Sequence, residues 1–252
     1  MPKQIAVAGK GGTGKTTLSA LIIRYIIEER PGKSILAVDA DANANLNEAL
    51  GLEGINPISD ILADIKDPKK VPEGMTKDIF VEYRLHSAMV ETKHYDLIVM
   101  GNPQGPGCYC FPSDLLRKHL ENLRDNYDYV VMDNEAGLEH ISRRIMSDID
   151  TLLVTSDSSA RGIRSAGRVH DIVKSVNLDV NQMGLVVGRI MNEGDVESLQ
   201  EEIEKTGLTL VGKIPMDPRV SEYDLKGNPL FDLPGDSPAY LAVKEMLDRL
   251  NI

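Results

Sequence analysis

Seven continuous apolar runs of four to seven residues recur along the chain and alternate with longer amphipathic stretches. A run that is apolar throughout, and does not alternate, is typical of a strand buried on both faces of a parallel sheet. The runs are Gln4–Ala8, Ser34–Ala40, Leu97–Met100, Tyr129–Asp133, Thr151–Thr155, Gly184–Arg189 and Leu210–Ile214. This alternation predicts an α/β fold: a doubly wound, mostly parallel sheet of about seven to eight strands with helices on both faces.

The stretches between the runs carry apolar residues at helical spacing. The clearest predicted helices are Thr17–Glu29, Ser113–Asn126, Ile163–Val176, Asp195–Thr206 and Pro238–Leu250. The stretch from Ile55 to Tyr95 has weaker periodicity and contains three prolines, so we expect a helical excursion that could form a partner or substrate surface. No linker interrupts the pattern, and residues 1–252 are expected to form a single domain. Ligands of such a sheet gather at the carboxyl ends of its strands.

A glycine-rich segment, GKGGTGKT from Gly9 to Thr16, joins the first strand to the first helix. Its glycines let successive N–H groups point inward at phosphates, and the positive end of the following helix adds a favourable field. Lys15 is expected to reach the β- and γ-phosphates, and the Thr16 hydroxyl to ligate Mg²⁺. The segment predicts a P-loop site for ATP or ADP with Mg²⁺. Its binding residues are Gly11, Gly12, Thr13, Gly14, Lys15, Thr16 and Thr17.

A second lysine, Lys10, follows the first glycine of this loop. It lies too close to the chain start to reach its own γ-phosphate easily. It could instead act on a nucleotide in a facing subunit, as an arginine finger does; the alternative is a solvated lysine. The pattern KGGxGKT resembles the deviant Walker A motif of the MinD/ParA/nitrogenase-iron-protein class, whose signature lysine crosses the dimer interface. The resemblance implies a homodimer driven by nucleotide.

Carboxylates follow two of the predicted strands. The second strand is followed by VDADANANL, with Asp39 and Asp41 two residues apart, and the fourth ends at Asp133. Such carboxylates beside a P-loop can hold Mg²⁺ or its waters and orient the attacking water; capping of the next helix is the alternative. The cluster resembles switch I of the same class, which implies that Asp41 positions water and Asp39 serves the Mg²⁺ shell. Asp133 matches a Walker B aspartate, which accepts hydrogen bonds from Mg²⁺-bound water.

Two later segments resemble the base-binding loops of this class. Asn192 matches an adenine-contacting asparagine, and Pro215 with Asp217 matches the loop that closes over the base. Asn and Asp in strand-end loops are also common turn formers, so that alternative stays open.

The only two cysteines, Cys108 and Cys110, lie in one glycine- and proline-rich loop just before a predicted helix. A helix N-terminus favours the thiolate that metals need. Two thiolates are half of a four-ligand set, and a two-fold dimer would supply the other half, for Zn²⁺ or Ni²⁺. The alternatives are two buried small side chains or a redox pair, whose intrachain disulfide would be strained.

Together with the P-loop, the segments GPGCYC and DNEAGLEH resemble the CooC-type ATPases that help insert nickel into carbon monoxide dehydrogenase. The resemblance implies a metallochaperone with that enzyme, or a related nickel enzyme, as its client. Residues 134–140 contain no cysteine, unlike the nitrogenase iron protein, and Pro238–Leu250 is acidic, unlike a basic membrane anchor. An iron–sulfur carrier of the same fold and a ParA/MinD-like positioning protein remain the alternatives.

The formal net charge is −11 and the pI is about 5.0. Nucleic-acid binders carry clustered Lys and Arg, so we expect no nucleic-acid partner. No apolar run approaches the length that spans a bilayer, and because the chain enters a strand at once we expect no signal peptide. Two cysteines do not make a secreted disulfide framework. The expected location is the cytoplasm, without membrane binding.

Overall fold

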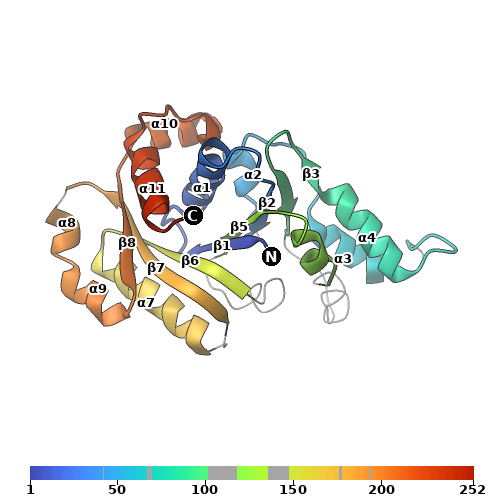
Figure 1. Cartoon of the computed structure of the whole chain (residues 1–252), viewed down its shortest axis with the longest axis horizontal. Coiled ribbons are helices and arrows are strands. Elements are labelled where there is room, and N and C mark those ends of the chain that lie inside the picture. The colour runs from blue at the N-terminus through green and yellow to red at the C-terminus, as the bar shows by residue number, and fades with distance from the viewer. Residues whose placement is uncertain (42, 67–69, 102–117, 136–147, 176–177, 193) are drawn as a thin grey trace.

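A single sheet forms the centre of the molecule in the computed structural model (Figure 1). The structure describes every residue except 42, 67–69, 102–117, 136–147, 176–177 and 193. Within that part the sheet has eight strands in the order β3-β4-β2-β5-β1-β6-β7-β8, all parallel except β3, which pairs antiparallel with β4. The strands are β1 Lys3–Gly9, β2 Ile35–Ala40, β3 Val90–Glu91, β4 Asp96–Val99, β5 Tyr129–Asn134, β6 Asp148–Asp157, β7 Asp179–Ile190 and β8 Thr209–Pro215. The predicted fold class is confirmed.

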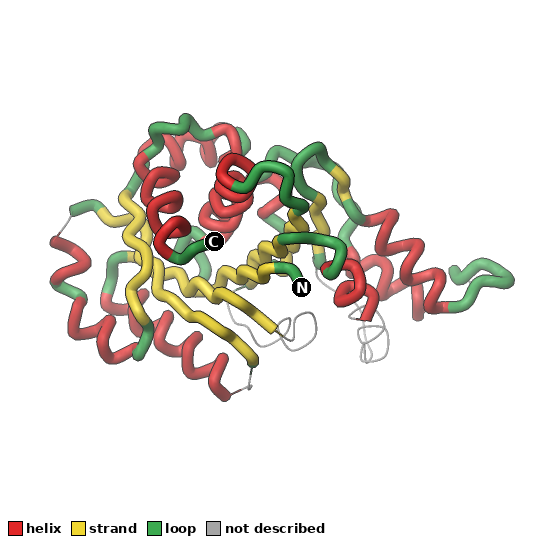
Figure 2. The backbone as a smooth tube through the Cα atoms, viewed as in Figure 1, coloured by secondary structure: helices red, strands yellow, loops and turns green. Residues whose placement is uncertain are grey.

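Helices cover both faces of this sheet (Figure 2). They are α1 Lys15–Glu29, α2 Leu46–Ala49, α3 Ile58–Lys66, α4 Lys77–Ala88, α7 Ala160–Ser175, α8 Gly194–Glu197, α9 Gln200–Thr206, α10 Pro218–Lys226, the 3₁₀ helix η1 Leu230–Asp232 and α11 Pro238–Arg249. One core joins α1, α2, η1 and α11 to the sheet, and the other joins α3, α4, α7 and α9 to its opposite face. No helix of the described residues is long and apolar enough to cross a membrane.

Strand β1 shows why the apolar runs are continuous. Ile5 and Val7 belong to the core on the α1 side, whereas Ala6 and Ala8 belong to the core on the α7 side. Successive side chains of a strand point to opposite faces, so a strand covered on both faces needs apolar residues at every position. All seven predicted runs overlap strands. The additional strand β3 has only two residues and was not recognised within the weakly periodic stretch.

The helices differ from the prediction in two main respects. The expected helix Asp195–Thr206 is two helices, α8 and α9, because the chain turns at Ser198, whose hydroxyl bonds the Asp195 carbonyl at 2.7 Å. Helix α10 was not predicted; it follows a capping residue, Asp217, and stops at Gly227, which has a left-handed φ of 65°. For the expected helix Ser113–Asn126, the described residues 118–124 are helical.

Candidate functional site

The P-loop connects β1 to α1 as a concave turn. Gly12 and Gly14 have φ of 78° and 88°, a left-handed backbone that residues with a Cβ adopt at a cost. A Cβ at Gly11, Gly12 or Gly14 would meet no atom within 4 Å, so these glycines face open space. Lys15 begins α1 directly behind them. The turn therefore presents backbone to a cavity, as a phosphate cradle requires.

Contacts beneath the loop hold its shape. The Thr13 hydroxyl lies 2.7 Å from the Lys10 carbonyl oxygen and 2.7 Å from the Thr155 hydroxyl, which also bonds the Ala8 carbonyl at 3.1 Å. A Cβ at Gly9 would come within 2.4 Å of the Thr155 hydroxyl oxygen, so only glycine fits there. Thr13 is buried, and its side chain supports the loop from the sheet side.

The two lysines of the loop lie in different surroundings. Lys15 is only 7% exposed, and its ammonium donates a long hydrogen bond of 3.4 Å to the Lys10 carbonyl. That contact is weak enough for a phosphate oxygen to replace it. Lys10 itself is exposed, whereas Thr16 and Thr17 are half-buried. Thr16 and Thr17 line the cavity together with Lys15.

A cavity of about 920 Å³ lies above the P-loop at the carboxyl ends of the strands. Its floor is the P-loop, and one wall comes from Asp41 and residues 43–54 after β2. The rest of the lining comes from Arg189 at the end of β7, Asp224 on α10 and residues 227–230, of which Pro229 lies against Gly51. Its place agrees with the rule that ligands of parallel sheets bind beyond the strands' carboxyl ends.

Asp39 is completely buried at the end of β2 and bonded by its own segment. Its Oδ1 accepts the Asp41 N–H at 3.1 Å, and its Oδ2 accepts the Leu46 N–H at 2.9 Å. Burial raises its pKa to about 7, and the neighbouring Asp133 carboxylate adds to the shift. Asp39 therefore folds the chain around the cavity wall, and its part in the Mg²⁺ shell stays a prediction.

Asp41 is held in a turn at the cavity wall. Its Oδ1 accepts two hydrogen bonds from Asn43, one from the backbone N–H at 2.9 Å and one from the side-chain amide at 3.0 Å. Both residues line the cavity. This local Asx turn fixes a carboxylate at the cavity surface, where it can meet a water molecule.

Asp133, on β5, has an unusual environment for a carboxylate. It is 1% exposed, and neither of its oxygens has a hydrogen-bonding partner among the described residues. Burial raises its pKa to about 6, and the nearby Thr16 hydroxyl and Lys15 ammonium oppose the shift. The nearby Ser19 hydroxyl, which also favours the ionised form of Asp133, is buried and has no hydrogen-bonding partner among the described residues. Unpaired buried oxygens beside a P-loop threonine fit Mg²⁺ with its bound water, because this ion prefers oxygen ligands and keeps several waters.

The residues expected to contact the base do not line this cavity. Asn192 is exposed, and its backbone N–H and side-chain amide donate to Asp195 at 3.0 and 3.3 Å. Pro215 ends β8. The cavity lining in the described part of the chain includes none of Asn192, Pro215 and Asp217. It includes Arg189 and Asp224, which no motif in the sequence singles out.

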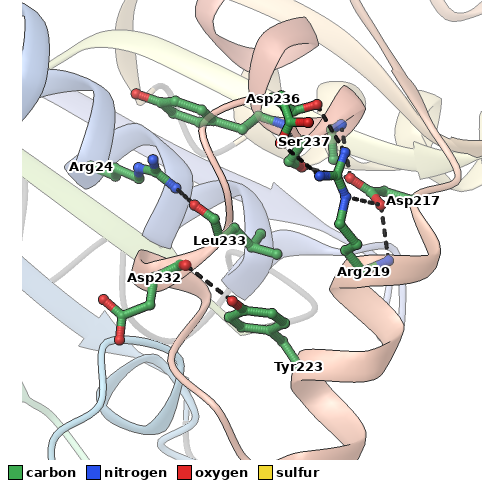
Figure 3. A network of polar contacts seen from close by, with 10 residues as sticks. Arg24, Asp217, Arg219, Tyr223, Asp232, Leu233, Asp236 and Ser237 are labelled. Carbon is green, nitrogen blue, oxygen red and sulfur yellow. Dashed lines mark hydrogen bonds and ion pairs between the residues drawn. The ribbon is translucent and has the colours of Figure 1, made fainter.

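Asp217 joins the starts of two helices (Figure 3). Its Oδ1 accepts the Arg219 N–H at 2.9 Å as the cap of α10, and its Oδ2 accepts the Ser237 hydroxyl at 2.6 Å, at the cap of α11. Arg219 also pairs with Asp236 at 2.7 Å. Burial works against ionisation of Asp217, but the bonds from Ser237 and Arg219 outweigh it and lower the pKa. This carboxylate is a capping residue here, and its adenine contact stays a prediction.

The cysteine pair lies outside the described residues. Cys108 and Cys110 fall within 102–117, and most of the DNEAGLEH segment falls within 136–147. Among the residues that are described, no group of three or more His, Cys, Asp or Glu is placed to hold a metal ion. The shared metal site therefore stays a hypothesis from the sequence.

Comparison with known proteins gives matches over most of the chain. Residues 5–230 match the family model "CobQ/CobB/MinD/ParA nucleotide binding domain". An uncharacterized ATP-binding protein of Methanocaldococcus jannaschii is 39% identical, over 98% of this chain and 97% of its own. The carbon monoxide dehydrogenase accessory protein CooC of Rhodospirillum rubrum is 27% identical, over 94% of this chain and 91% of its own.

Solved structures agree with this assignment. The MinD cell division protein of Aquifex aeolicus superposes with a TM-score of 0.72 at 26% identity, covering 99% of this chain and 96% of that one. The sheet of this chain and the cavity above its P-loop fit a nucleotide-hydrolysing domain. The chain thus belongs to the CobQ/CobB/MinD/ParA family of nucleotide-binding proteins and is a P-loop ATPase.

Proposed function

We propose that this ATPase is a metallochaperone that assists nickel insertion into carbon monoxide dehydrogenase or a related nickel enzyme. One coincidence carries the proposal. The chain is similar to CooC, a carbon monoxide dehydrogenase accessory protein, over nearly its whole length, and it also has two closely spaced thiols, Cys108 and Cys110. Thiolates are the ligands that soft and borderline metal ions prefer, and an ATPase that only moved on a surface would not need them.

In this function the residues in and around the cavity bind and hydrolyse ATP. The amides of the P-loop and the Lys15 ammonium bind the phosphates, and the Thr16 hydroxyl holds the magnesium ion. Asp133, whose oxygens have no hydrogen-bonding partner among the described residues, would accept hydrogen bonds from a magnesium-bound water. Asp41, fixed at the cavity wall, orients the attacking water. Bound Mg²⁺ would neutralise charge that develops on the transferred phosphoryl group.

The dimer half rests on Lys10 and on the count of thiolates. Lys10 is exposed beside a cavity that faces solvent, so its ammonium can act on a nucleotide in a second copy of the chain. A two-fold dimer also brings together four thiolates, which complete a tetrahedral site. We propose that a single domain, residues 1–252, carries both functions, and that ATP hydrolysis changes the dimer and releases the metal cargo to its client.

A positioning ATPase is the second candidate. The septum site-determining protein MinD of Bacillus subtilis is 28% identical, over 90% of this chain. That function needs attachment to an anionic surface, and here the net charge of −11 and the acidic residues Glu245 and Asp248 of α11 oppose it. An iron–sulfur carrier of the same fold is a third candidate, since paired thiolates also hold clusters.

Metal analysis of anaerobically purified protein, with sedimentation, separates these candidates. We expect one nickel or zinc ion per dimer, lost in a Cys108→Ala, Cys110→Ala double variant that still binds ATP. An Asp41→Ala variant is the matched control, because it should keep the metal and lose hydrolysis. One metal per monomer without a change in mass would contradict the shared site. A brown iron–sulfur chromophore would support the iron–sulfur carrier. Binding to anionic vesicles by protein that contains no metal would support the positioning ATPase.

The dimer can be tested separately with Lys10→Ala. We expect this variant to bind ATP with nearly the parental affinity but to lose ATP-induced dimerisation and turnover, because the missing cation belongs to the partner's site. Sedimentation with a non-hydrolysed ATP analogue measures the first loss. Parental dimerisation and turnover in Lys10→Ala would show that the lysine is merely solvated.

A further inference from the structure

A second cavity lies at the edge of the sheet opposite the P-loop. It has a volume of about 320 Å³ and lies between the turn from α1 to β2 and the turn from β3 to β4. Ser34 directly precedes β2 and Asp96 begins β4, so this cavity is at the amino ends of two neighbouring parallel strands. Asp41, beyond the carboxyl end of β2, lines the nucleotide cavity instead. The two cavities share no lining residue in the described part of the chain.

Positive charge gathers around this second cavity, although the chain as a whole has a net charge of −11. Its lining includes three cations, Arg30, Lys33 and Lys93, and the imidazole of His94. Asp96 is the only acidic side chain among the described lining residues. A cavity lined by an excess of one sign of charge concentrates ions of the opposite sign, so this one favours anions.

The side chains of Lys33 and Arg30 are held in place by the folded chain. The Lys33 ammonium pairs with the Asp128 carboxylate at 2.8 Å. The Arg30 guanidinium donates to the main-chain oxygens of Glu29 and Ile252 at 3.0 and 2.6 Å. These contacts fix two of the cations at the cavity wall, where they contribute charge but have most of their donors engaged.

Lys93 and His94 differ from them, because both are exposed and their side chains form no hydrogen bond or ion pair with any described residue. The turn that carries them is nevertheless well defined. The Thr92 hydroxyl oxygen accepts the N–H groups of His94 and Tyr95 at 3.3 and 3.1 Å, and the Thr92 N–H donates to the Tyr95 carbonyl at 3.0 Å. A fixed turn therefore presents two unused donors to the cavity, which reduces the entropy cost of binding a ligand there.

We propose that this cavity binds a small molecule with a dianionic phosphate group, either inorganic phosphate or a phosphomonoester. The Lys93 ammonium and the His94 imidazole donate to the phosphate oxygens, and Arg30 and Lys33 supply positive charge behind them. A phosphate group has several strong acceptor oxygens, so it can accept from several donors at once. The volume is near the lower end of small-molecule sites, about 300–1,000 Å³, which suits a phosphate with few further atoms. The site is independent of ATP binding and of the proposed function.

The variants Lys93→Ala and His94→Ala remove the two unused donors. Both residues are exposed, so these variants should melt at the parental temperature. Lys174→Ala is the matched control, because Lys174 is an exposed cation on α7 that does not line the cavity. Every variant is made in a Lys15→Ala background, in which the P-loop should not bind phosphate.

The test is calorimetric titration of these proteins with inorganic phosphate, glycerol 3-phosphate and acetate, at about 0.15 M salt to screen surface charge. We expect both phosphates to bind the Lys15→Ala background protein. Lys93→Ala should weaken their binding about tenfold, and the Lys93→Ala, His94→Ala pair should remove measurable binding. Tighter binding of glycerol 3-phosphate would identify a phosphomonoester as the ligand, and equal affinity would identify inorganic phosphate.

Three results would overturn the proposal. The first is no binding of either phosphate to the background protein. The second is an equal loss of affinity in Lys174→Ala, because phosphate would then respond to surface charge in general. The third is acetate binding as tight as phosphate binding, because the cavity would then select no more than a negative charge.

Discussion

The ends of β2 and β5 carry two buried aspartates side by side, Asp39 and Asp133, which pair directly across the two strands. Asp39 accepts backbone N–H groups on both oxygens, whereas Asp133 has no hydrogen-bonding partner among the described residues. Both pKa values are raised by burial, to about 7 and about 6. A buried carboxylate whose oxygens accept hydrogen bonds from nearby backbone N–H groups stabilises the local chain conformation. A buried carboxylate without such bonds indicates a site for a water molecule or an ion.

The end of β2 also supplies Asp41, so the two neighbouring strand ends divide three tasks. Asp39 bonds the backbone of the segment that follows β2, and Asp41 lines the cavity. Asp133 is buried and does not line the cavity. Substitutions at these three aspartates should therefore change different properties: turnover for Asp41, Mg²⁺ dependence for Asp133 and stability for Asp39.

The largest effect is expected for Asp41→Ala. Because Asp41 orients the attacking water and does not hold phosphates, ATP turnover should fall by about 10²- to 10⁴-fold with ATP affinity nearly unchanged. Steady-state hydrolysis and calorimetric titration measure the two quantities. Asp171→Ala, on the exposed face of α7, serves as the control and should behave as the parent. Parental turnover in Asp41→Ala would assign the water to another group.

Asp133→Asn should reduce Mg²⁺-dependent turnover by about 10- to 100-fold, the usual cost of losing a partner of a metal-bound water. Unlike most buried substitutions it should not destabilise the metal-free protein, because it removes a buried charge that accepts no hydrogen bond from the described residues. Activity measured against Mg²⁺ concentration should show a weaker apparent affinity for the ion. A large loss of stability without any change in Mg²⁺ dependence would contradict the contrast with Asp39.

Asp39→Asn, unlike Asp133→Asn, should destabilise the metal-free protein. The amide that replaces one carboxylate oxygen is a donor, so it cannot accept both the Asp41 and the Leu46 N–H groups. Leaving a buried N–H unpaired should lower the free energy of unfolding by about 1–3 kcal/mol. Urea denaturation of the metal-free protein measures it, with Asp133→Asn as the paired comparison. Equal stability of the two variants would remove the distinction between them.

The smallest effect concerns pH. Both carboxyl groups have folded-state pKa values above their ordinary value of 3.8, so between about pH 4 and 7 the folded state binds more protons than the unfolded state. The stability that these groups contribute is full below about pH 4 and is lost as the pH rises towards 7. Asp133→Asn should make that loss smaller, by on the order of 1 kcal/mol. Denaturation midpoints at pH 5 and pH 7.5, without Mg²⁺ or nucleotide, measure the change. An identical slope in the variant would show that Asp133 is ionised throughout.

The strands and the P-loop were predictable because their signals are local. An apolar run with a glycine-rich turn and a helix behind it can fold in few ways, and Gly9–Thr16 lies where the pattern placed it. The roles of the loop residues after the later strands were not predictable, because Asn and Asp form turns and helix caps as readily as they bind ligands. Asp217 caps α10 here by accepting the Arg219 N–H, whereas Asn192 donates to the Asp195 carboxylate.

The sequence by itself determined the α/β class, the positions of the main strands and the phosphate-binding loop, since each depends on periodicity or on residues adjacent in the chain. The tertiary structure alone decided which carboxylate is satisfied, Asp39 or Asp133, and that Arg189 faces the cavity. These features depend on strands that are distant in sequence and adjacent only in the sheet. Burial and hydrogen-bond partners are properties of that arrangement, and identical side chains acquire different chemistry from it.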